Sequence, residues 1–285
     1  MGLRNIAKKS VSARVLNLFL TVLIGYVLLL ILVRLFEARL IFFPNYPDRM
    51  DGDWHPPVLP VQDVWLTAAD GVKLHAWWIP HELAKVTFLA FHGNASNIAN
   101  RAPIYEFLHD APANVLAVEY RGYGRSEGRP SEAGIYRDAD AGYDYLVSTK
   151  GIEPGSIISF GQSLGTTVAT HLAAHRPVAG LVLEAAFPSA SRVAQQVYWF
   201  LPGISLAVYG QFNTAAWIKE VRAPKLIVHC KQDPVIPFGF GQEVFAAALA
   251  PKTFVAIENS CHEEASLMAP RKYREALGQF LESVR

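Results

Sequence analysis

The sequence predicts an α/β fold in which a mostly parallel sheet is covered by helices on both faces and led by an antiparallel hairpin. From residue 61 onward, short apolar runs typical of buried strands alternate with longer segments of helical periodicity. A serine between two glycines, in SFGQSLGTT (159–167), stands where one such run meets the next helical segment. An uncharged apolar segment near the N-terminus lies apart from this pattern. The 285 residues are therefore expected to form one large domain with an N-terminal appendage.

The N-terminal segment is expected to be a transmembrane anchor. Residues 15–33, VLNLFLTVLIGYVLLLILV, form a run of 19 residues without a charge, close to the ~20 that a helix needs to cross a bilayer. The run is apolar on all sides, which argues against a core helix with one buried face. A cleaved signal peptide is the rival interpretation, but the run is longer than a usual signal-peptide core and no A-x-A-like site follows it.

The charges around this span predict its orientation. A basic flank, residues 1–14, contributes four basic residues before the span, and two more follow it closely. Because positive flanks stay in the cytoplasm, we expect a cytoplasmic N-terminus and a large domain outside the cytoplasm. The six residues are Arg4, Lys8, Lys9, Arg14, Arg34 and Arg39.

The remainder of the chain argues against a nucleic-acid surface. Residues 40–285 hold 20 basic and 24 acidic residues, a net charge of −4, and no basic run. The expected partners are a small-molecule or lipid acyl substrate and the membrane, and the sequence carries no signal for an oligomeric state.

The elements follow one another in the order expected of a parallel sheet. Residues 34–60 are expected to form a neck, because residues 42–60 are rich in proline and aspartate. The large domain, 61–285, begins with two strand-like runs around Asp70-Gly71, which is a hairpin signal. Further strands are predicted near 86–93, 114–122, 155–160, 180–187, 224–230 and 252–258, and helices near 98–111, 131–151, 164–175, 241–250 and from 270 on, with a cap insert at about 187–222.

Ser163 is the candidate nucleophile. The apolar strand GSIISF precedes it and the helical segment LGTTVATHLAAH follows it. Strand, sharp turn and helix form the setting of a nucleophile elbow, in which Gly161 and Gly165 relieve crowding. The alternative, a loop serine in a chance G-x-S-x-G pattern, does not account for this context.

His262 is the candidate general base. The base is expected after the nucleophile in the chain and at the carboxyl end of a strand. His171 and His175 lie on the helix that follows Ser163, and His229 lies inside a predicted strand. His262, in the loop after the last strand, combines the expected order with the expected position.

Asp233 is the candidate acid that orients the base. Of the five acidic residues between Ser163 and His262, Glu184 and Asp233 follow strands closely. Asp233 lies after the penultimate strand, beside a proline that stiffens the loop, and Glu184 is the alternative. In the expected reaction Ser163 attacks a carbonyl carbon, His262 takes and returns the proton, and Asp233 orients the imidazole.

Two backbone N–H groups are expected to form an oxyanion hole. One belongs to Leu164, directly after the serine and at a helix N-terminus. The other belongs to Asn94 in the loop HGNAS, where Gly93 lets the backbone approach closely. His92, in the same loop, is expected to shape the loop rather than to act as the base.

Five ordered motifs resemble the α/β-hydrolase superfamily: FHGNAS, VEYRGYGRSEG, GIYRDADAGYDYL, GQSLG and LIVHCKQDPVIP. Within it, residues 42–285 resemble the membrane-anchored branch related to yeast Bem46, with ABHD13- and ABHD17-like serine hydrolases. The resemblance implies the α/β-hydrolase fold, the triad Ser163, Asp233 and His262, and no cofactor; no metal site is expected. Some relatives of this kind cleave acyl esters or thioesters. Members usually carry glycine where this chain has Cys230 and Cys261.

The cap insert is expected to cover the active site. Most of its aromatic residues are expected to pack the insert onto the body of the domain. An apolar cap insert close to a membrane anchor favours binding of an acyl chain over binding of a charged peptide. We therefore predict hydrolysis of carboxylic ester or thioester bonds of a lipid-like substrate. A serine peptidase of the same fold and a non-catalytic hydrolase-fold scaffold are the alternatives.

The two cysteines are expected to be neighbours if the acid and the base are hydrogen-bonded. Cys230 ends the strand that leads to Asp233, and Cys261 directly precedes His262. A disulfide would tie the acid loop to the base loop and would persist in an oxidising compartment. We favour two buried free thiols, because a disulfide needs Cα atoms within about 7 Å and a strand end need not face the histidine loop in that way.

Overall fold

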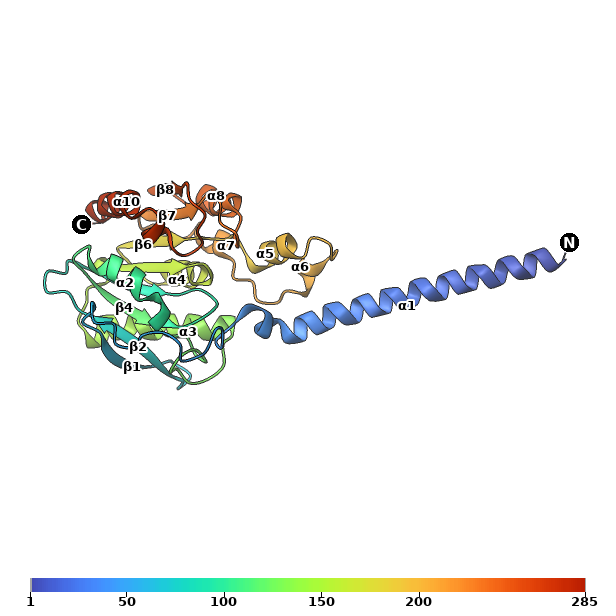
Figure 1. Cartoon of the computed structure of the whole chain (residues 1–285), viewed down its shortest axis with the longest axis horizontal. Helices are drawn as coiled ribbons and strands as arrows, with labels where there is room; N and C mark the ends of the chain where they lie inside the picture. The colour runs from blue at the N-terminus through green and yellow to red at the C-terminus, as the bar shows by residue number, and fades with distance from the viewer. Residues whose placement is uncertain (1, 285) are drawn as a thin grey trace.

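The computed structural model describes residues 2–284, with side chains from Ala13 onward. Helix α1 (Gly2–Ile41) projects from the body of the molecule, so that its first turns lie far from the sheet (Figure 1). The side chains of Arg4, Lys8 and Lys9, on which the expected orientation partly rests, lie outside the described side chains.

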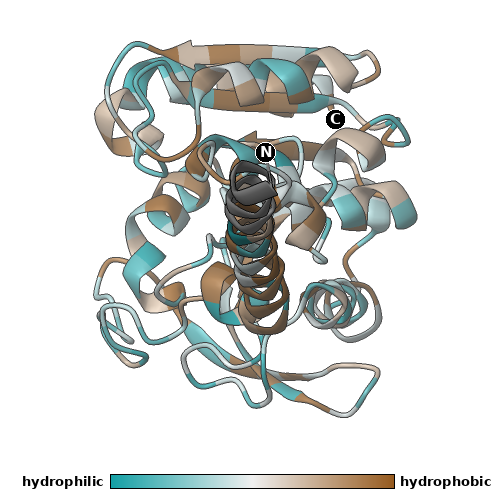
Figure 2. Ribbon diagram, turned by 90° about the vertical axis from the view of Figure 1, so that its right-hand side faces the viewer, coloured by the Kyte–Doolittle hydropathy of each residue, from teal (hydrophilic) through white to brown (hydrophobic). Residues whose placement is uncertain are grey.

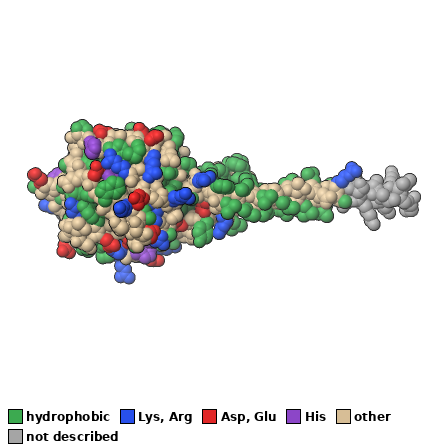
Figure 3. All heavy atoms as spheres, turned by 90° about the horizontal axis from the view of Figure 1, so that it is seen from below, with side chains coloured by type: hydrophobic (Ala, Val, Ile, Leu, Met, Phe, Trp, Pro, Cys, Tyr) green, Lys and Arg blue, Asp and Glu red, His purple; other side chains and the backbone are tan. Residues whose placement is uncertain are grey.

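Helix α1 has the length and the composition of a membrane span. Within its segment Ala13–Ile41, the most apolar stretch of 18 residues has a mean hydropathy of 2.7 and is not buried against the body. Much of the projecting helix has the colour of hydrophobic residues in the ribbon of Figure 2, and hydrophobic side chains line it in Figure 3. At 1.5 Å per residue, the 40 residues of α1 extend about 60 Å, which exceeds the ~30 Å hydrocarbon core of a bilayer. These properties fit a membrane anchor and a signal sequence alike.

The body is built on an eight-stranded sheet in the order β1-β2-β4-β3-β5-β6-β7-β8. The pairs β1–β2 and β2–β4 are antiparallel, and every pair from β4 to β8 is parallel, which confirms the predicted leading hairpin and mostly parallel sheet. The strands are β1 (Gln62–Thr67), β2 (Lys73–Ile79), β3 (Val86–Phe91), β4 (Ala113–Val118), β5 (Ile157–Gln162), β6 (Gly180–Glu184), β7 (Lys225–Cys230) and β8 (Lys252–Ile257).

Helices cover both faces of this sheet, and its central strands are therefore buried and mostly apolar. Every residue of β3, VTFLAF, is buried. One face is covered by α3 (Glu132–Asp144), α4 (Leu164–His175) and α8 (Phe238–Ala247), and the other by α2 (Ala102–His109) and α10 (Pro270–Ser283). Short helical segments are η1 (Ile98–Arg101), η2 (Tyr145–Thr149), η3 (Pro154–Ser156) and α9 (Ala265–Met268).

The insert between β6 and β7 forms a small helical cap beside the base of α1 (Figure 1). It consists of α5 (Ala190–Val197), α6 (Ile204–Ala207) and α7 (Thr214–Trp217). The side chain of Ser189 caps α5 by accepting a hydrogen bond from the Arg192 N–H. Gly203, with φ +77°, precedes α6 in a left-handed conformation that favours glycine.

The predicted neck is a loop only in its second half. Helix α1 continues past the expected end of the span at Val33 to Ile41, so that residues 34–41 are helical. Residues 42–61 are irregular but packed on the body: the Arg49 guanidinium donates to the carbonyl oxygens of Gly124 (2.7 Å) and Ser126 (2.6 Å). The neck thus holds the base of α1 against the domain.

Candidate active site

Ser163 stands on a sharp turn between β5 and α4. Its backbone has φ +49° and ψ −116°, a conformation that residues other than glycine rarely adopt. A Cβ atom on Gly161 would overlap the carbonyl oxygen of Gly165, and a Cβ atom on Gly165 would overlap that of Phe91. The two glycines of GQSLG are therefore required by close backbone contacts. The turn presents the serine hydroxyl at the carboxyl end of the parallel strands.

Three side chains from separate loops meet at the carboxyl end of the sheet. Ser163 follows β5, Asp233 follows β7 and His262 follows β8. The Nε2 atom of His262 lies 2.9 Å from Ser163 Oγ, and its Nδ1 atom lies 2.8 Å from Asp233 Oδ2. The Asp233 carboxylate is fully buried, and its Oδ1 atom accepts from the N–H groups of Val235 and Ile236, both at 2.8 Å. A continuous chain of hydrogen bonds therefore joins the serine hydroxyl to a buried carboxylate.

The electrostatics of this chain favour an anionic aspartate and a basic histidine. Burial acts to raise the pKa of Asp233, but the hydrogen bond and charge of His262 and two backbone N–H groups outweigh it, so the pKa is lowered. Burial acts to lower the pKa of His262, but the hydrogen bond to Asp233 and the charges of Glu263, Asp233 and Glu264 outweigh it, so the pKa is raised. His262 is thus suited to accept the serine proton.

Glu184, the alternative acid, has a different place. It is fully buried at the end of β6, and its carboxylate accepts from the N–H of Ala265 (2.9 Å) and from the side chain of Gln162 (3.0 Å). Burial raises the pKa of Glu184 to about 8, although both hydrogen bonds act to lower it. Its partners belong to the loop after His262 and to the strand that leads to Ser163, so Glu184 braces these two segments.

Two of the other candidate histidines, His229 and His171, pack within the fold, whereas His175 is exposed on α4. His229 is fully buried in β7, with Nε2 3.0 Å from the carbonyl oxygen of Ile236 and 3.5 Å from Asp233 Oδ2. Burial lowers the pKa of His229, which keeps the ring neutral beside the acid loop. His171 stacks on Tyr136, with ring centroids 4.0 Å apart. Both rings therefore serve packing.

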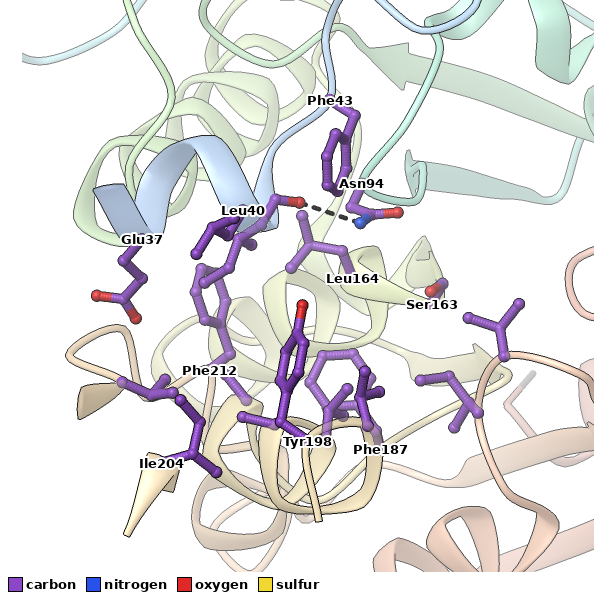
Figure 4. Close-up of a pocket in the computed structure, with 18 of the residues that line it drawn as sticks. Glu37, Leu40, Phe43, Asn94, Ser163, Leu164, Phe187, Tyr198, Ile204 and Phe212 are labelled. Atoms are coloured by element: carbon purple, nitrogen blue, oxygen red, sulfur yellow. Dashed lines mark hydrogen bonds between the residues drawn. The ribbon is translucent and has the colours of Figure 1, made fainter. Parts of the chain in front are cut away.

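The backbone of Leu164 and Asn94 lies beside the serine, and both residues line the same cavity (Figure 4). Leu164 is the first residue of α4, where an N–H group has no acceptor within the helix. The Asn94 side chain donates to the carbonyl oxygen of Ile41 at 3.0 Å. The backbone carbonyl oxygen of Asn94 accepts from the Phe43 N–H at 2.9 Å. Within the part of the chain that the structure describes, neither amide N–H donates to a protein acceptor. The neck thus helps to hold the loop of Asn94.

Side chains from the loop after β4 also hold this segment, and the sequence analysis did not assign them. The hydroxyl of Tyr120 donates to the carbonyl of His92 at 2.9 Å, and that of Tyr123 donates to the carbonyl of Asn94 at 2.8 Å. His92 Nε2 lies 3.1 Å from Glu119 Oε1, without the alignment of a hydrogen bond, and both side chains are fully buried. The motif VEYRGYG, which contains these tyrosines, is the signal that could have indicated them.

An ion pair that the sequence did not indicate links the histidine loop to the loop of Asn94. Arg101 Nη1 lies 2.6 Å from Glu263 Oε2, and the two side chains are 18% and 9% exposed. The Glu263 carboxylate packs against Gly93 so closely that a Cβ atom there would overlap it. The glycine of HGNAS therefore makes room for the neighbour of His262.

Cys230 and Cys261 form a disulfide, with Cα atoms 5.6 Å apart, so the favoured interpretation of two free thiols is wrong. Strands β7 and β8 pair in parallel with Cys230 opposite Ile257, and the loop after β8 folds back over the end of β7. This return, which also carries His262 to Asp233, brings the two cysteines together.

Ser163 opens into an apolar cavity of about 340 Å³ (Figure 4). One side of the cavity is formed by the body, another by the cap, and a third by the last turns of α1 and the neck. The residues from α1 and the neck are Val33, Glu37, Leu40, Ile41 and Phe43; those from the cap region are Phe187, Ala190, Val193, Ala194, Val197, Tyr198, Ile204, Val208 and Phe212.

Comparison with known proteins places relatives of this chain among hydrolases. The family model described as "Serine aminopeptidase, S33" matches residues 83–206. An uncharacterized protein of Mycobacterium tuberculosis is 34% identical over 248 residues, which cover 86% of this chain and 87% of the relative. The α/β-hydrolase domain-containing protein WAV2 of Arabidopsis thaliana is 32% identical over 273 residues, covering 87% and 88% of the two chains. The α/β-hydrolase domain-containing protein 17B of Xenopus laevis is 33% identical over 199 residues, covering 70% and 67%.

Solved structures share the fold. The esterase Pf2001 of Pyrococcus furiosus superimposes with a TM-score of 0.68 at 20% identity, covering 82% of this chain and 96% of the esterase. At this identity the similarity concerns the fold of the sheet and its helices.

Proposed function

This chain belongs to the α/β-hydrolase superfamily, in its Bem46/ABHD-like branch, and is an esterase-like serine hydrolase; on this premise we propose that it cleaves carboxylic ester or thioester bonds of an apolar, lipid-like acyl substrate while anchored in a membrane. One observation carries the proposal. The hydroxyl of Ser163, hydrogen-bonded to its base, opens into an apolar cavity between the cap and the base of α1.

The proposed reaction runs through an acyl-enzyme. Ser163 Oγ attacks the carbonyl carbon of the substrate while His262 Nε2 accepts its proton, and Asp233 stabilises the charged imidazole. The N–H groups of Leu164 and Asn94 stabilise the negative oxygen of the tetrahedral intermediate. The intermediate expels the alcohol or thiol, which takes the proton from His262. Water then attacks the acyl-enzyme with His262 again as the base, and the acid is released.

The lining of the cavity supports an acyl substrate. Its volume of about 340 Å³ falls within the ~300–1,000 Å³ of small-molecule sites. Of the described residues that line it, Glu37 carries the single charge, and its Oε1 atom accepts a hydrogen bond from the Gly210 N–H at 2.8 Å. An acyl chain would therefore meet mainly aliphatic and aromatic side chains.

The domain organisation and the orientation are part of the proposal. Residues 1–14 form a basic flank, 15–33 the membrane anchor, 34–60 the neck, and 61–285 the catalytic domain with its cap at about 187–222. The catalytic domain lies outside the cytoplasm. The disulfide supports this side of the membrane, since disulfides persist in oxidising compartments. Fusions of alkaline phosphatase and green fluorescent protein at Arg285 test it: fluorescence without phosphatase activity would overturn the orientation.

A serine peptidase is the second candidate, favoured by the description of the matching family model. A peptidase acting on free N-termini would need an acidic group free to bind the ammonium. The one carboxylate that lines the described cavity, Glu37, is engaged by the cap backbone. A non-catalytic scaffold is disfavoured by the continuous hydrogen-bond chain from Ser163 to Asp233.

A fluorophosphonate probe tests nucleophile and substrate class together. The full-length protein should be labelled, and p-nitrophenyl esters of increasing chain length should compete with increasing efficiency. Competition by aminoacyl anilides in place of the esters would favour the peptidase. Absence of labelling in a folded protein would overturn the proposed hydrolase mechanism.

A further inference from the structure

The tip of the cap presents an unusually apolar surface. We define the cap tip as residues 197–209, which include α6. Leu206 and Trp199 are 82% and 81% exposed, and Tyr209 is 71% exposed. None of residues 193–218 is charged. Such a contiguous apolar surface on a folded domain is typical of a contact site for a membrane or a partner.

The cap tip lies along α1 (Figure 1). The Tyr26 hydroxyl donates to the carbonyl oxygen of Pro202, and the Arg34 guanidinium lies 4.9 Å from the ring centre of Tyr209. Arg34 is the first charged residue after the uncharged span, so it marks the level at which that span ends. The cap tip therefore begins near this level and reaches back along the span.

The depth of this reach follows from helix geometry. Tyr26 lies seven residues before Val33, the last residue of the uncharged span. At 1.5 Å per residue this separation is about 10 Å along the helix axis. Pro202 contacts the helix at that depth. If residues 15–33 occupy the ~30 Å hydrocarbon core, the cap tip lies within the leaflet nearest the catalytic domain.

We propose that the cap tip inserts into this leaflet beside α1 and that the substrate, an acyl lipid of the same leaflet, reaches Ser163 through the cavity between α1 and the cap. The proposal rests on the proposed membrane anchoring. It adds the route by which the substrate enters the cavity and the surface, the cap tip, that brings this route into contact with lipid.

The lining of the cavity supports this route. Leu40 of α1 and Tyr198 and Ile204 of the cap line it (Figure 4), together with Val33 of α1 and Val197 of the cap. Val33 is the last residue of the uncharged span, and Val197 and Tyr198 are also 51% and 41% exposed. The same segments thus line the cavity and belong to the surfaces that would face the acyl chains, so an acyl chain would pass from lipid to cavity between apolar side chains.

A bilayer fits this surface better than a second protein does. The surface lies against α1, and it carries exposed tyrosine and tryptophan side chains, which gather at membrane interfaces. Part of the backbone of the cap tip is paired within the segment, which lowers the cost of insertion: the N–H groups of Leu201, Ile204 and Leu206 donate to carbonyl oxygens of the same segment.

Tryptophan quenching by lipid tests the insertion. Helix α1 contains no tryptophan, and Trp199 is the most exposed of the six in the chain. The full-length protein is reconstituted in vesicles of phosphatidylcholine with brominated acyl chains. We expect Trp199→Phe to abolish most of the quenching by bromine. Trp65→Phe is the matched control, because Trp65 is 57% exposed on β1, away from α1. Quenching that is unchanged by Trp199→Phe would overturn the insertion.

A charge on the cap tip tests the route. Leu206→Glu should lower hydrolysis of a long-chain acyl ester in vesicles by about tenfold or more, because a carboxylate in a bilayer is costly. Hydrolysis of soluble p-nitrophenyl acetate should be unchanged, since Leu206 does not line the cavity. Leu83→Glu is the control: Leu83 is 72% exposed but precedes β3, at the amino ends of the parallel strands, whereas the cap follows the carboxyl end of β6. Equal vesicle activity of Leu206→Glu and wild type would overturn the route.

The two measurements separate this inference from the proposed function. If the wild-type protein does not bind vesicles, the anchoring is refuted. If the wild-type protein does not hydrolyse a soluble ester, the proposed chemistry is refuted. A bound and active enzyme whose Trp199 is not quenched refutes the insertion alone. Dimers that form in detergent and are lost in Leu206→Glu would show that a second copy covers the cap tip, which also refutes it.

Discussion

The cavity above Ser163 has two walls of opposite character. The wall formed by the body is built on loops that a disulfide, the Arg101–Glu263 ion pair and the hydrogen bonds of the buried Glu184 carboxylate tie together behind the cavity lining. The wall formed by the cap and α1 consists, apart from Glu37, mainly of apolar side chains, several of which are exposed. The difference indicates that the chemistry is carried by the body and the choice of substrate by the cap and α1, so mutations should affect the two separately.

The largest effect is expected in the body wall, at Ser163. Ser163→Ala should abolish probe labelling and lower kcat/KM by about a hundred-thousandfold, because the hydroxyl is the proposed nucleophile and the members of a catalytic triad act as a unit. The kcat/KM of His262→Ala should fall by a similar factor. Ser156→Ala, at the other end of β5, is the control and should match the wild type. Retained labelling of Ser163→Ala would end the assignment of the nucleophile.

The two buried acids should differ strongly. Asp233→Asn should lower kcat by about ten-thousandfold, because the imidazole loses the group that orients it and stabilises its charge. Glu184→Gln should lower kcat by less than about tenfold, because glutamine keeps an acceptor for the Ala265 N–H. Steady-state kinetics with a soluble ester compare the two. A larger loss in Glu184→Gln would make Glu184 the acid.

Removal of the disulfide should destabilise the body wall without changing substrate preference. Cys230→Ala combined with Cys261→Ala should lower the free energy of unfolding by about 3 kcal/mol, because the bridge restricts a loop with a sequence separation of 31 residues. Urea unfolding of this variant and of the reduced wild type measures the effect. Intact mass after alkylation of the unreduced, denatured protein is the check: two alkylated thiols would disprove the bridge.

Shortening α1 should change the other wall. Chains that begin at Arg34 and at Phe42 share the catalytic domain, but only the first retains Leu40 and Ile41 in the cavity lining. Both should hydrolyse a short soluble ester equally. The chain beginning at Phe42 should lose about tenfold in kcat/KM for a long-chain ester, because apolar contact area is removed. Identical chain-length profiles would show that α1 contributes nothing to substrate choice.

The pH dependence should report on the body wall alone. Because the pKa of His262 is raised above its usual value of 6.5, kcat/KM should fall as pH drops through a midpoint above 6.5, about tenfold per pH unit below it. Glu263→Gln removes one of the negative charges that raise this pKa, so it should move the midpoint to lower pH. A pH–rate profile with a soluble ester measures both. A midpoint that rises in Glu263→Gln would contradict the assigned cause.

The sequence alone was sufficient to predict the fold and to propose the candidate triad. The alternation of strand and helix periodicity predicts the parallel sheet. The order of these elements along the chain assigns Ser163, Asp233 and His262 to loops at the carboxyl ends of the strands. These features depend on local patterns and on the direction of each strand. Such patterns survive without knowledge of the exact packing.

Only the tertiary structure decided which loops touch and what closes the cavity. Several contacts join loops that are separated in the sequence. They are the disulfide between Cys230 and Cys261, the Arg101–Glu263 ion pair, and the hydrogen bonds that the Tyr120 and Tyr123 hydroxyls donate. Their pairing depends on how each loop turns, which no periodicity encodes. The sequence likewise separated α1 from the active site, whereas the structure brings its last turns into the cavity wall. An apolar helix carries the same pattern whether it contacts lipid or a cavity, and only its position beside the cap distinguishes the two.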